Sequence, residues 1–211
     1  MADWYFDFIS PFAYLQFVRL GELAGARLRL RPVLFAGLLQ HWGQLGPAEI
    51  PAKRRFTYRH VLWRARTLGV ALRFPPAHPF NPLGVLRLAI ACGAQREQVG
   101  ALFDGIWRDG LDPEADWDAL CASVALSGEQ GRAMIGSDAV KTALRANTEQ
   151  AIAAGVFGVP TLVVGGQLFW GVDATEMATA YLGDRALFDD GEMRRVSTLP
   201  SGRERPRGGR R

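Results

Sequence analysis

The chain has 211 residues, of which 48% are hydrophobic, 22% charged and 10% aromatic, a composition typical of one large globular domain or a small domain carrying an insertion. No run approaches the roughly 20 apolar residues that a membrane-spanning helix needs. The N-terminus, MADWYFDF, is acidic where a signal peptide would be basic, so we expect a cytoplasmic protein that does not bind membranes.

The formal net charge of +4 is concentrated at the C-terminal end. The segment from Pro200 to Arg211, PSGRERPRGGRR, holds five of the 25 basic and one of the 21 acidic residues, which leaves twenty of each in the body. Without apolar residues this tail is predicted to be disordered. A neutral body argues against nucleic-acid binding, which favours a basic folded face.

The first 35 residues predict a β-α-β unit. Dense apolar and aromatic residues from Asp3 to Ile9 indicate a buried strand. A helix is expected from Pro11 to Ala24, with proline at its first position and Gly25 as its stop. The following ARLRLRPVLF alternates as a strand does, and one strand-helix-strand crossover implies that the two strands are parallel.

A helical middle and a hairpin follow. Helices are expected over Leu38 to Trp42 and Pro51 to Leu68, then four or five more between Leu83 and Ala154. GVPTLVVGGQLFWGVD predicts strands Thr161–Val164 and Gln167–Trp170, joined at a Gly-Gly turn. A last helix is expected from about Ala174 to Leu182.

The cysteines and histidines suggest neither a disulfide nor a metal site. Cys92 and Cys121 both lie in helix-like sequence and are interpreted as small hydrophobic residues. The three histidines are scattered and lack the spacing of metal ligands. No metal is therefore predicted.

This order of elements, with GVFGVPT before the hairpin, resembles a thioredoxin-like fold with a helical insertion, the DsbA-like arrangement, an α/β class. Where that superfamily has Cys-x-x-Cys, this chain has Ser10-Pro11-Phe12-Ala13. The resemblance implies a thioredoxin-like domain formed by residues 1–35 and 155–185 and a helical insertion of residues 36–154. Thiol-disulfide exchange by protein sulfurs at this position is excluded.

Four motifs resemble those of the 2-hydroxychromene-2-carboxylate isomerases and the related kappa-class glutathione transferases. They are SPF-Y, GPAEIPAKR, FPPAHPFN and FWGVD, and with GVFGVPT they follow the family's order. Two departures from the kappa pattern, Val172-Asp173 in place of Ser-Asp and Gln44 in place of Asn, favour the isomerase branch.

The resemblance gives Ser10 a candidate catalytic role that needs no protein base. A hydroxyl can donate a hydrogen bond to the thiolate of bound glutathione, and a helix N-terminus stabilises the same anion. The alternative is a simple helix N-cap, a common use of serine. The two roles are compatible.

The resemblance also implies a glutathione site and a substrate pocket. The Val159–Pro160 bond is expected to be cis, and Asp173 to bind the γ-glutamyl ammonium group, although Asp173 could instead be an N-cap. The cofactor-binding candidates are Ser10, Val159, Pro160, Trp170, Gly171, Val172, Asp173 and Lys53. The substrate-binding candidates are Gln44, Asn81, Trp42 and Phe80, of which Asn81 could equally begin a helix.

The expected function is glutathione-dependent isomerisation of a 2-hydroxychromene-2-carboxylate-like aromatic compound to its trans-benzylidenepyruvate isomer. Two alternatives use the same scaffold, namely a kappa-type glutathione transferase and a non-catalytic module that binds glutathione or a peptide. The expected partner is a small aromatic carboxylate. The oligomeric state is left open, with a homodimer as one option.

Overall fold

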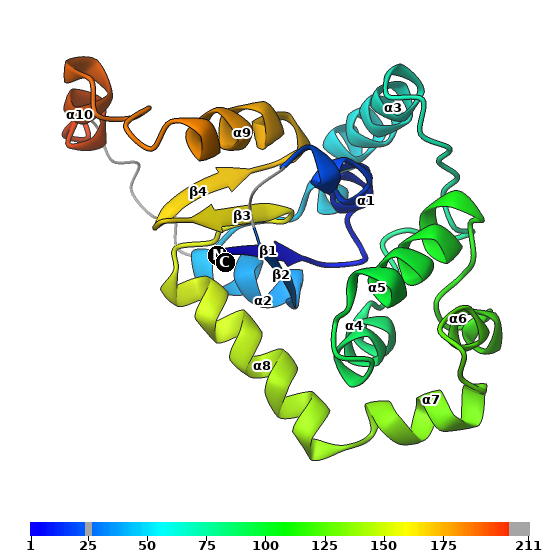
Figure 1. Ribbon diagram of the computed structural model, residues 1–211. Helices are drawn as coiled ribbons and strands as arrows, with labels where there is room; N and C mark the ends of the chain where they lie inside the picture. Colours follow the sequence, from blue (N-terminus) through cyan, green and yellow to red (C-terminus); the bar gives the residue numbers. More distant parts are fainter. Residues whose placement is uncertain (24–26, 203–211) are drawn as a thin grey trace, which may run out of the picture.

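One four-stranded sheet is built from both ends of the chain (Figure 1). The computed structural model describes residues 1–23 and 27–202. Strands β1 (Ala2–Phe6) and β2 (Leu28–Pro32) are parallel, whereas β3 (Thr161–Val164) is antiparallel to both β1 and β4 (Gln167–Trp170). The strand order is β2-β1-β3-β4, so the pair at the centre of the sheet joins β1, near the N-terminus, to β3, with Ala2 opposite Val164.

Helices cover both faces of this sheet because alternate residues of β1 are buried on opposite sides. Trp4 and Phe6 belong to the larger apolar cluster, beside α1 and α9. Tyr5 belongs to a second cluster with Leu38 and Ala151, on the face covered by α2 and α8. The helices concerned are α1 (Pro11–Arg19), α2 (Phe35–Trp42), α8 (Asp138–Ala153) and α9 (Thr175–Gly183).

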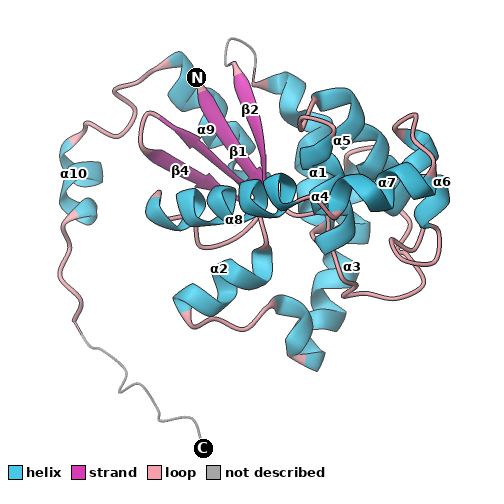
Figure 2. Ribbon diagram, turned by 90° about the horizontal axis from the view of Figure 1, so that it is seen from below, coloured by secondary structure: helices cyan, strands magenta, loops and turns pink. Residues whose placement is uncertain are grey.

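The remaining helices lie mainly between β2 and β3 in the sequence. They are α3 (Pro51–Thr67), α4 (Leu83–Ala91), α5 (Arg96–Phe103), the π-helical turn η3 (Asp104–Arg108), α6 (Trp117–Ser123) and α7 (Gly128–Ile135), with the short 3-10 turns η1 (Leu20–Glu22), η2 (Pro47–Glu49) and η4 (Val172–Ala174). Beyond α9, α10 (Gly191–Ser197) stands apart from the other helices and buries none of its residues (Figure 2). Among the helices of the described ranges, none is long and apolar enough to cross a membrane.

The sheet and the inserted helices share one apolar cluster. The ring of Phe103 on α5 lies with its centroid 4.6 Å from that of Phe8 and 5.5 Å from that of Phe6. This packing fixes the segment after β1, which carries Ser10, against the insertion. The division into two domains at residues 36 and 155 stays a prediction.

Several predicted boundaries are confirmed and others are wrong. The hairpin strands match, and Gly165 and Gly166 both have positive φ angles, as their turn requires. The first strand is shorter than predicted, because it ends at Phe6 and a turn follows. The first α-helix ends at Arg19 and continues as the 3-10 turn η1. Gly25 and residues 203–211 lie outside the described residues, and α10 was not predicted.

Candidate active site

The strand register brings three loops together at the same end of the sheet, where β1 and β4 finish and β3 starts. Tyr5 near the end of β1 pairs with Thr161 at the start of β3, and Thr161 pairs with Trp170 at the end of β4. The segments that follow β1 and β4 and the segment that precedes β3 therefore leave the sheet on the same side. The backbone N–H of Gly171 donates to the carbonyl of Pro160 over 2.9 Å, which ties two of the loops together.

Ser10 is the N-cap of α1. Its backbone is extended, and its Oγ accepts a hydrogen bond from the backbone N–H of Ala13 over 3.2 Å. The side chain is buried, with 8% of the residue exposed. The predicted capping role is thus confirmed. Within the described residues the hydroxyl proton donates to no protein acceptor, so it is free to donate to a bound group at the positive end of α1.

The Val159–Pro160 peptide bond is cis, as the motif predicted. Val159 and Pro160 are buried directly before β3. Thr161 Oγ1 donates to the carbonyl of Gly158 over 2.7 Å and so holds the preceding turn in place. This arrangement places the Val159 backbone at the end of the sheet where β1 finishes and α1 follows.

The segment after β4 combines an exposed aromatic ring, a strained glycine position and a carboxylate. Trp170 is 54% exposed and its ring lies 5.1 Å from that of Phe157. Gly171 has a φ angle of 91°, and a Cβ there would lie 2.6 Å from Asp173 Oδ1, so only glycine fits. Val172 is buried.

The predicted alternative for Asp173, a helix N-cap, is not what the structure has. The N-cap positions are Gly171 for η4 and Ala174 for α9, and Asp173 lies between them, inside η4. Asp173 is exposed, and within the described residues its carboxylate has no hydrogen-bond or ion-pair partner. It is therefore available to bind a cation.

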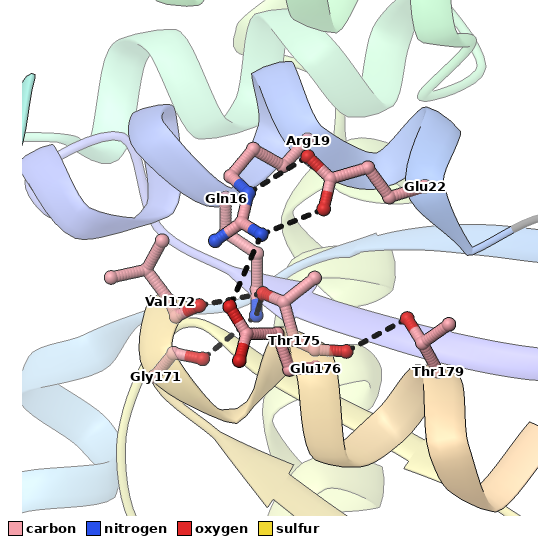
Figure 3. A network of polar contacts seen from close by, with 8 residues as sticks. All are labelled: Gln16, Arg19, Glu22, Gly171, Val172, Thr175, Glu176 and Thr179. Atoms are coloured by element: carbon pink, nitrogen blue, oxygen red, sulfur yellow. Dashed lines mark hydrogen bonds and ion pairs between the residues drawn. The ribbon is translucent and has the colours of Figure 1, made fainter. Parts of the chain in front are cut away.

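Gln16 joins α1 to the Gly171 loop, and sequence reasoning missed it (Figure 3). The side chain is 1% exposed and accepts from Trp4 Nε1 over 2.7 Å. Its Nε2 donates to the Gly171 carbonyl over 2.8 Å and to Thr175 Oγ1 over 3.1 Å, and Thr175 donates to the Val172 carbonyl. The one available signal was a lone amide inside the apolar helical sequence PFAYLQF.

Three of the predicted substrate contacts have structural roles in the described chain. Trp42 is 42% exposed, and its Nε1 donates to the Val156 carbonyl over 2.9 Å. Phe80 is half-buried against the ring of Trp107. Asn81 lies one residue before Pro82, the N-cap of α4, and its side chain accepts from the backbone N–H of Leu83 and donates to Glu114, so it supports the start of the helix without being its cap.

Gln44 and Lys53 are exposed, and their side chains have no hydrogen-bond or ion-pair partner within residues 1–23 and 27–202. Lys53 lies in the first turn of α3, as predicted. No hydrogen bond in the described residues connects either side chain to the cluster around Ser10. Their roles as ligand contacts stay predictions.

A buried carboxylate, Asp7, and a half-buried imidazole, His78, contact the residue before Ser10, and both were missed from the sequence. Asp7 is fully buried, and burial raises its pKa to about 7, although hydrogen bonds from the backbone N–H groups of Phe35 and Ile9 oppose the shift. Burial lowers the pKa of His78, which also hydrogen-bonds the Ile9 carbonyl. The signal for Asp7 was a charged residue within the apolar FDFIS.

The protein thiols lie on other elements. Cys92 follows the last residue of α4 and Cys121 is buried in α6, and both are free. Burial raises the pKa of both thiols, which favours the unreactive protonated form.

Comparisons with known proteins identify the family of this chain. The family model of the DSBA-like thioredoxin domain matches residues 2–183. The chain is 33% identical over 201 residues to a 2-hydroxychromene-2-carboxylate isomerase of Sphingobium xenophagum, covering 86% of this chain and 97% of the relative. The chain belongs to the 2-hydroxychromene-2-carboxylate isomerase family. This family, as predicted, consists of enzymes with the DsbA-like thioredoxin fold.

Two further similarities concern a related transferase and a solved structure. The chain is 25% identical over 207 residues to a kappa 1 glutathione S-transferase of Rattus norvegicus, covering 88% of this chain and 92% of that relative. A solved 2-hydroxychromene-2-carboxylate isomerase superposes with a TM-score of 0.76 at 24% identity, covering 95% of this chain and 99% of that one. The latter confirms the predicted fold.

Proposed function

We propose that this enzyme is a glutathione-dependent isomerase of a 2-hydroxychromene-2-carboxylate-like aromatic compound. The observation that carries the proposal is the Ser10 hydroxyl, which caps α1 with its oxygen and keeps its proton free at the helix N-terminus. Such a donor suits a thiolate brought in by a cofactor, because the protein's own thiols lie on other elements, with Cys92 directly after α4 and Cys121 in α6.

The proposed cofactor-binding residues fit glutathione by their chemistry. Asp173 offers an unpaired carboxylate to the γ-glutamyl ammonium group, and Lys53 offers a cation to a carboxylate. The backbone of Val159 next to the cis Pro160 suits pairing with the peptide groups of glutathione, as an added strand would. Trp170, Gly171 and Val172 would form the wall beside it.

The protein's contribution to the reaction is to hold a thiolate and to orient the substrate. When bound, glutathione would supply a sulfur nucleophile for reversible addition to the conjugated double bond, and it would therefore not be consumed. Ser10 donates a hydrogen bond to the sulfur, and the dipole of α1 favours its negative charge. Trp42, Phe80, Gln44 and Asn81 are the proposed contacts to the substrate.

The second candidate is a kappa-type glutathione transferase, favoured by the similarity to the rat transferase. It would use the same cofactor site but would consume glutathione as a conjugate. The residue pair Val172-Asp173 lacks the serine of the kappa motif, so a side-chain contact to glutathione would be missing.

The test is the absorbance change of 2-hydroxychromene-2-carboxylate on isomerisation, followed with and without glutathione. We expect turnover to require glutathione and the free glutathione concentration to stay constant over many turnovers. Equal turnover in its absence would refute the cofactor, and stoichiometric loss of glutathione would identify a transferase.

We place the enzyme in the cytoplasm, because a thiol cofactor has to stay reduced and both cysteines are free. A homodimer stays a prediction, to be measured by sedimentation velocity.

A further inference from the structure

Ionisable side chains contact both backbone polar groups of Ile9, the residue directly before Ser10. Asp7 Oδ1 accepts from the Ile9 N–H over 3.0 Å, and His78 Nε2 contacts the Ile9 carbonyl over 2.8 Å. We propose that Asp7 and His78 are positioning residues that fix the turn carrying the Ser10 hydroxyl. The proposal rests on the proposed function of Ser10, which is to stabilise a bound thiolate.

His78 reaches this turn from the insertion, 69 positions away in sequence. Because a carbonyl oxygen only accepts hydrogen bonds, Nε2 has to carry the proton. Tyr58 on α3 lies behind the imidazole, with its hydroxyl 2.7 Å from both Nδ1 and the carbonyl of His78. In the neutral imidazole, the Tyr58 hydroxyl therefore donates to Nδ1 and holds the tautomer that contacts Ile9.

The same contacts survive protonation of His78. In the imidazolium, Nδ1–H donates to the Tyr58 oxygen, and the Tyr58 proton turns to the His78 carbonyl. The bond from Nε2–H to Ile9 remains in both states and is stronger in the charged one. Tyr58 thus supports the positioning contact on either side of the His78 pKa.

Aromatic rings fix the imidazole plane. The centroids of Phe74, Phe80 and Trp107 lie 5.8, 5.8 and 5.5 Å from that of His78. Trp107 Nε1 also donates to the carbonyl of Phe8 over 2.8 Å, one residue further back on the same turn. Apart from Tyr58, no titratable or charged group of the described residues faces the ring.

Asp7 holds the turn from the other side. Its second oxygen accepts from the backbone N–H of Phe35 over 2.9 Å, where α2 begins, and its carbonyl accepts from Ser10 N–H over 3.1 Å. Both carboxylate oxygens are acceptors only while Asp7 is ionised. Protonation turns one oxygen into a donor and makes it a weaker acceptor, so one of the two bonds is weakened. Within the described residues no charged side chain faces this carboxylate.

The contacts of Asp7 and His78 with Ile9 matter for function because the hydrogen bond from Ser10 to a bound thiolate weakens steeply when its geometry is lost. If either contact is lost, Ser10 is still present, but its hydroxyl can move away from the sulfur of bound glutathione. A merely structural role would lower stability without changing the acidity of a bound thiol in protein that is still folded.

The test uses His78→Ala, His78→Gln and the control His41→Gln, because His41 is exposed on α2 and contacts only the ring of Trp42 among the described aromatic residues. Two readouts are compared in folded protein, namely the backbone amide resonance of Ser10 and the ultraviolet absorbance of bound glutathione thiolate against pH. We expect His78→Ala to move the Ser10 amide and to lower the thiolate fraction at neutral pH by about tenfold, equivalent to one pKa unit. The Gln side chain also ends in an N–H donor, so His78→Gln should recover most of the loss.

Tyr58→Phe provides a second variant if His78→Ala fails to fold, since it keeps the ring and removes only the contacts of the hydroxyl to Nδ1 and the carbonyl of His78. We expect it to move the Ser10 amide in the same direction by a smaller amount. For Asp7, the Ser10 amide should titrate near pH 7 in wild type and not in Asp7→Asn.

The outcomes separate this proposal from the function of the site. If glutathione binds as thiolate and His78→Ala leaves both its titration and the Ser10 amide unchanged, the positioning role is refuted. If glutathione does not bind but the Ser10 amide responds to His78 and Asp7 as described, the positioning of the turn stands and the proposed function fails.

Discussion

The Ser10 hydroxyl has two hydrogen-bonding capacities, and the fold uses only the acceptor for the cap of α1. We predict that Ser10→Ala raises the pKa of bound glutathione by about one to two units, since a hydrogen bond to a charged group is worth roughly 1.5–3 kcal/mol. Turnover at neutral pH should fall by roughly 10- to 100-fold if thiolate addition limits the rate. Ultraviolet titration of the bound thiolate measures the shift directly.

A matched control separates this effect from the loss of a cap. Ser127 caps α7 by accepting from the Gln130 N–H over 3.1 Å, the same kind of contact as at Ser10 but made by an exposed serine. Ser127→Ala should lower stability by about 1 kcal/mol, as Ser10→Ala does through its cap, and leave turnover unchanged. Overlapping thiolate titrations for wild type and Ser10→Ala, with glutathione bound, would mean that Ser10 is only a cap.

Asp7 makes stability depend on pH with an unusual sign for a carboxylate. Its pKa is about 7 in the folded protein and near 3.8 when unfolded, so the folded state binds the extra proton between these values. Stability contributed by this group is therefore full below pH 4 and is lost as pH rises through 7, by up to about 4 kcal/mol. The Asp7→Asn variant has no ionisable group at this position, so it lacks this pH-dependent contribution to stability.

The measurement is the free energy of unfolding by urea at pH 5 and pH 8. We expect the difference between wild type and Asp7→Asn to shift in favour of the variant at pH 8, even if the amide weakens one of the two backbone contacts. Parallel pH profiles for the two proteins would contradict the raised pKa of Asp7.

At the scale of elements, α1 is placed against the Gly171 loop by the buried Gln16 amide (Figure 3). We predict that Gln16→Glu keeps the acceptor for Trp4 but loses the donor to the Gly171 carbonyl and buries a charge. Glutathione affinity should fall by roughly tenfold or more, since a buried group left without its partner costs about 1–3 kcal/mol. Calorimetric titration with glutathione measures this.

The control for Gln16 lies on the same helix. Arg19 also reaches α9, through Glu176 at 3.9 Å, but its main partner is Glu22 at the surface (Figure 3). Arg19→Gln should change affinity by less than about 1 kcal/mol, as expected of an exposed ion pair. An equal loss in both variants would show that Gln16 has no special part in placing the Gly171 loop.

The elements themselves were largely predictable because local patterns specify them. The hairpin follows from two glycines that adopt positive φ angles, and α3 follows from a long helical run after Pro51. The end of β1 was not predictable, because the apolar pattern continues to Ile9 while the carboxylate of Asp7 turns the chain by binding the Ile9 N–H.

At the scale of the whole molecule, the resemblance supplied the fold and the hypothesis that Ser10, Pro160 and Asp173 belong to one site. The resemblance did not predict the contacts of Asp7, His78 and Gln16 near Ser10. His78 and Ile9 are 69 positions apart, and Gln16 and Gly171 are 155 apart. Such long-range pairs depend on how the insertion packs on the sheet, and no periodicity or motif in one sequence encodes them.

The whole arrangement places a hydroxyl and a helix dipole at the site and both protein sulfurs elsewhere. We therefore predict that Cys92→Ala and Cys121→Ala, singly and together, retain turnover within about twofold, with stability lowered by roughly 1 kcal/mol per change, as is usual for point mutations. Cys121 is the stricter case, because its sulfur lies 2.4 Å from the position that a Cβ on Gly131 would occupy, so α6 and α7 pack tightly there. Turnover is to be compared at equal concentrations of folded protein and saturating glutathione. A folded double variant without activity would mean that a protein thiol takes part in the reaction, which the positions of Cys92 on α4 and Cys121 in α6 argue against.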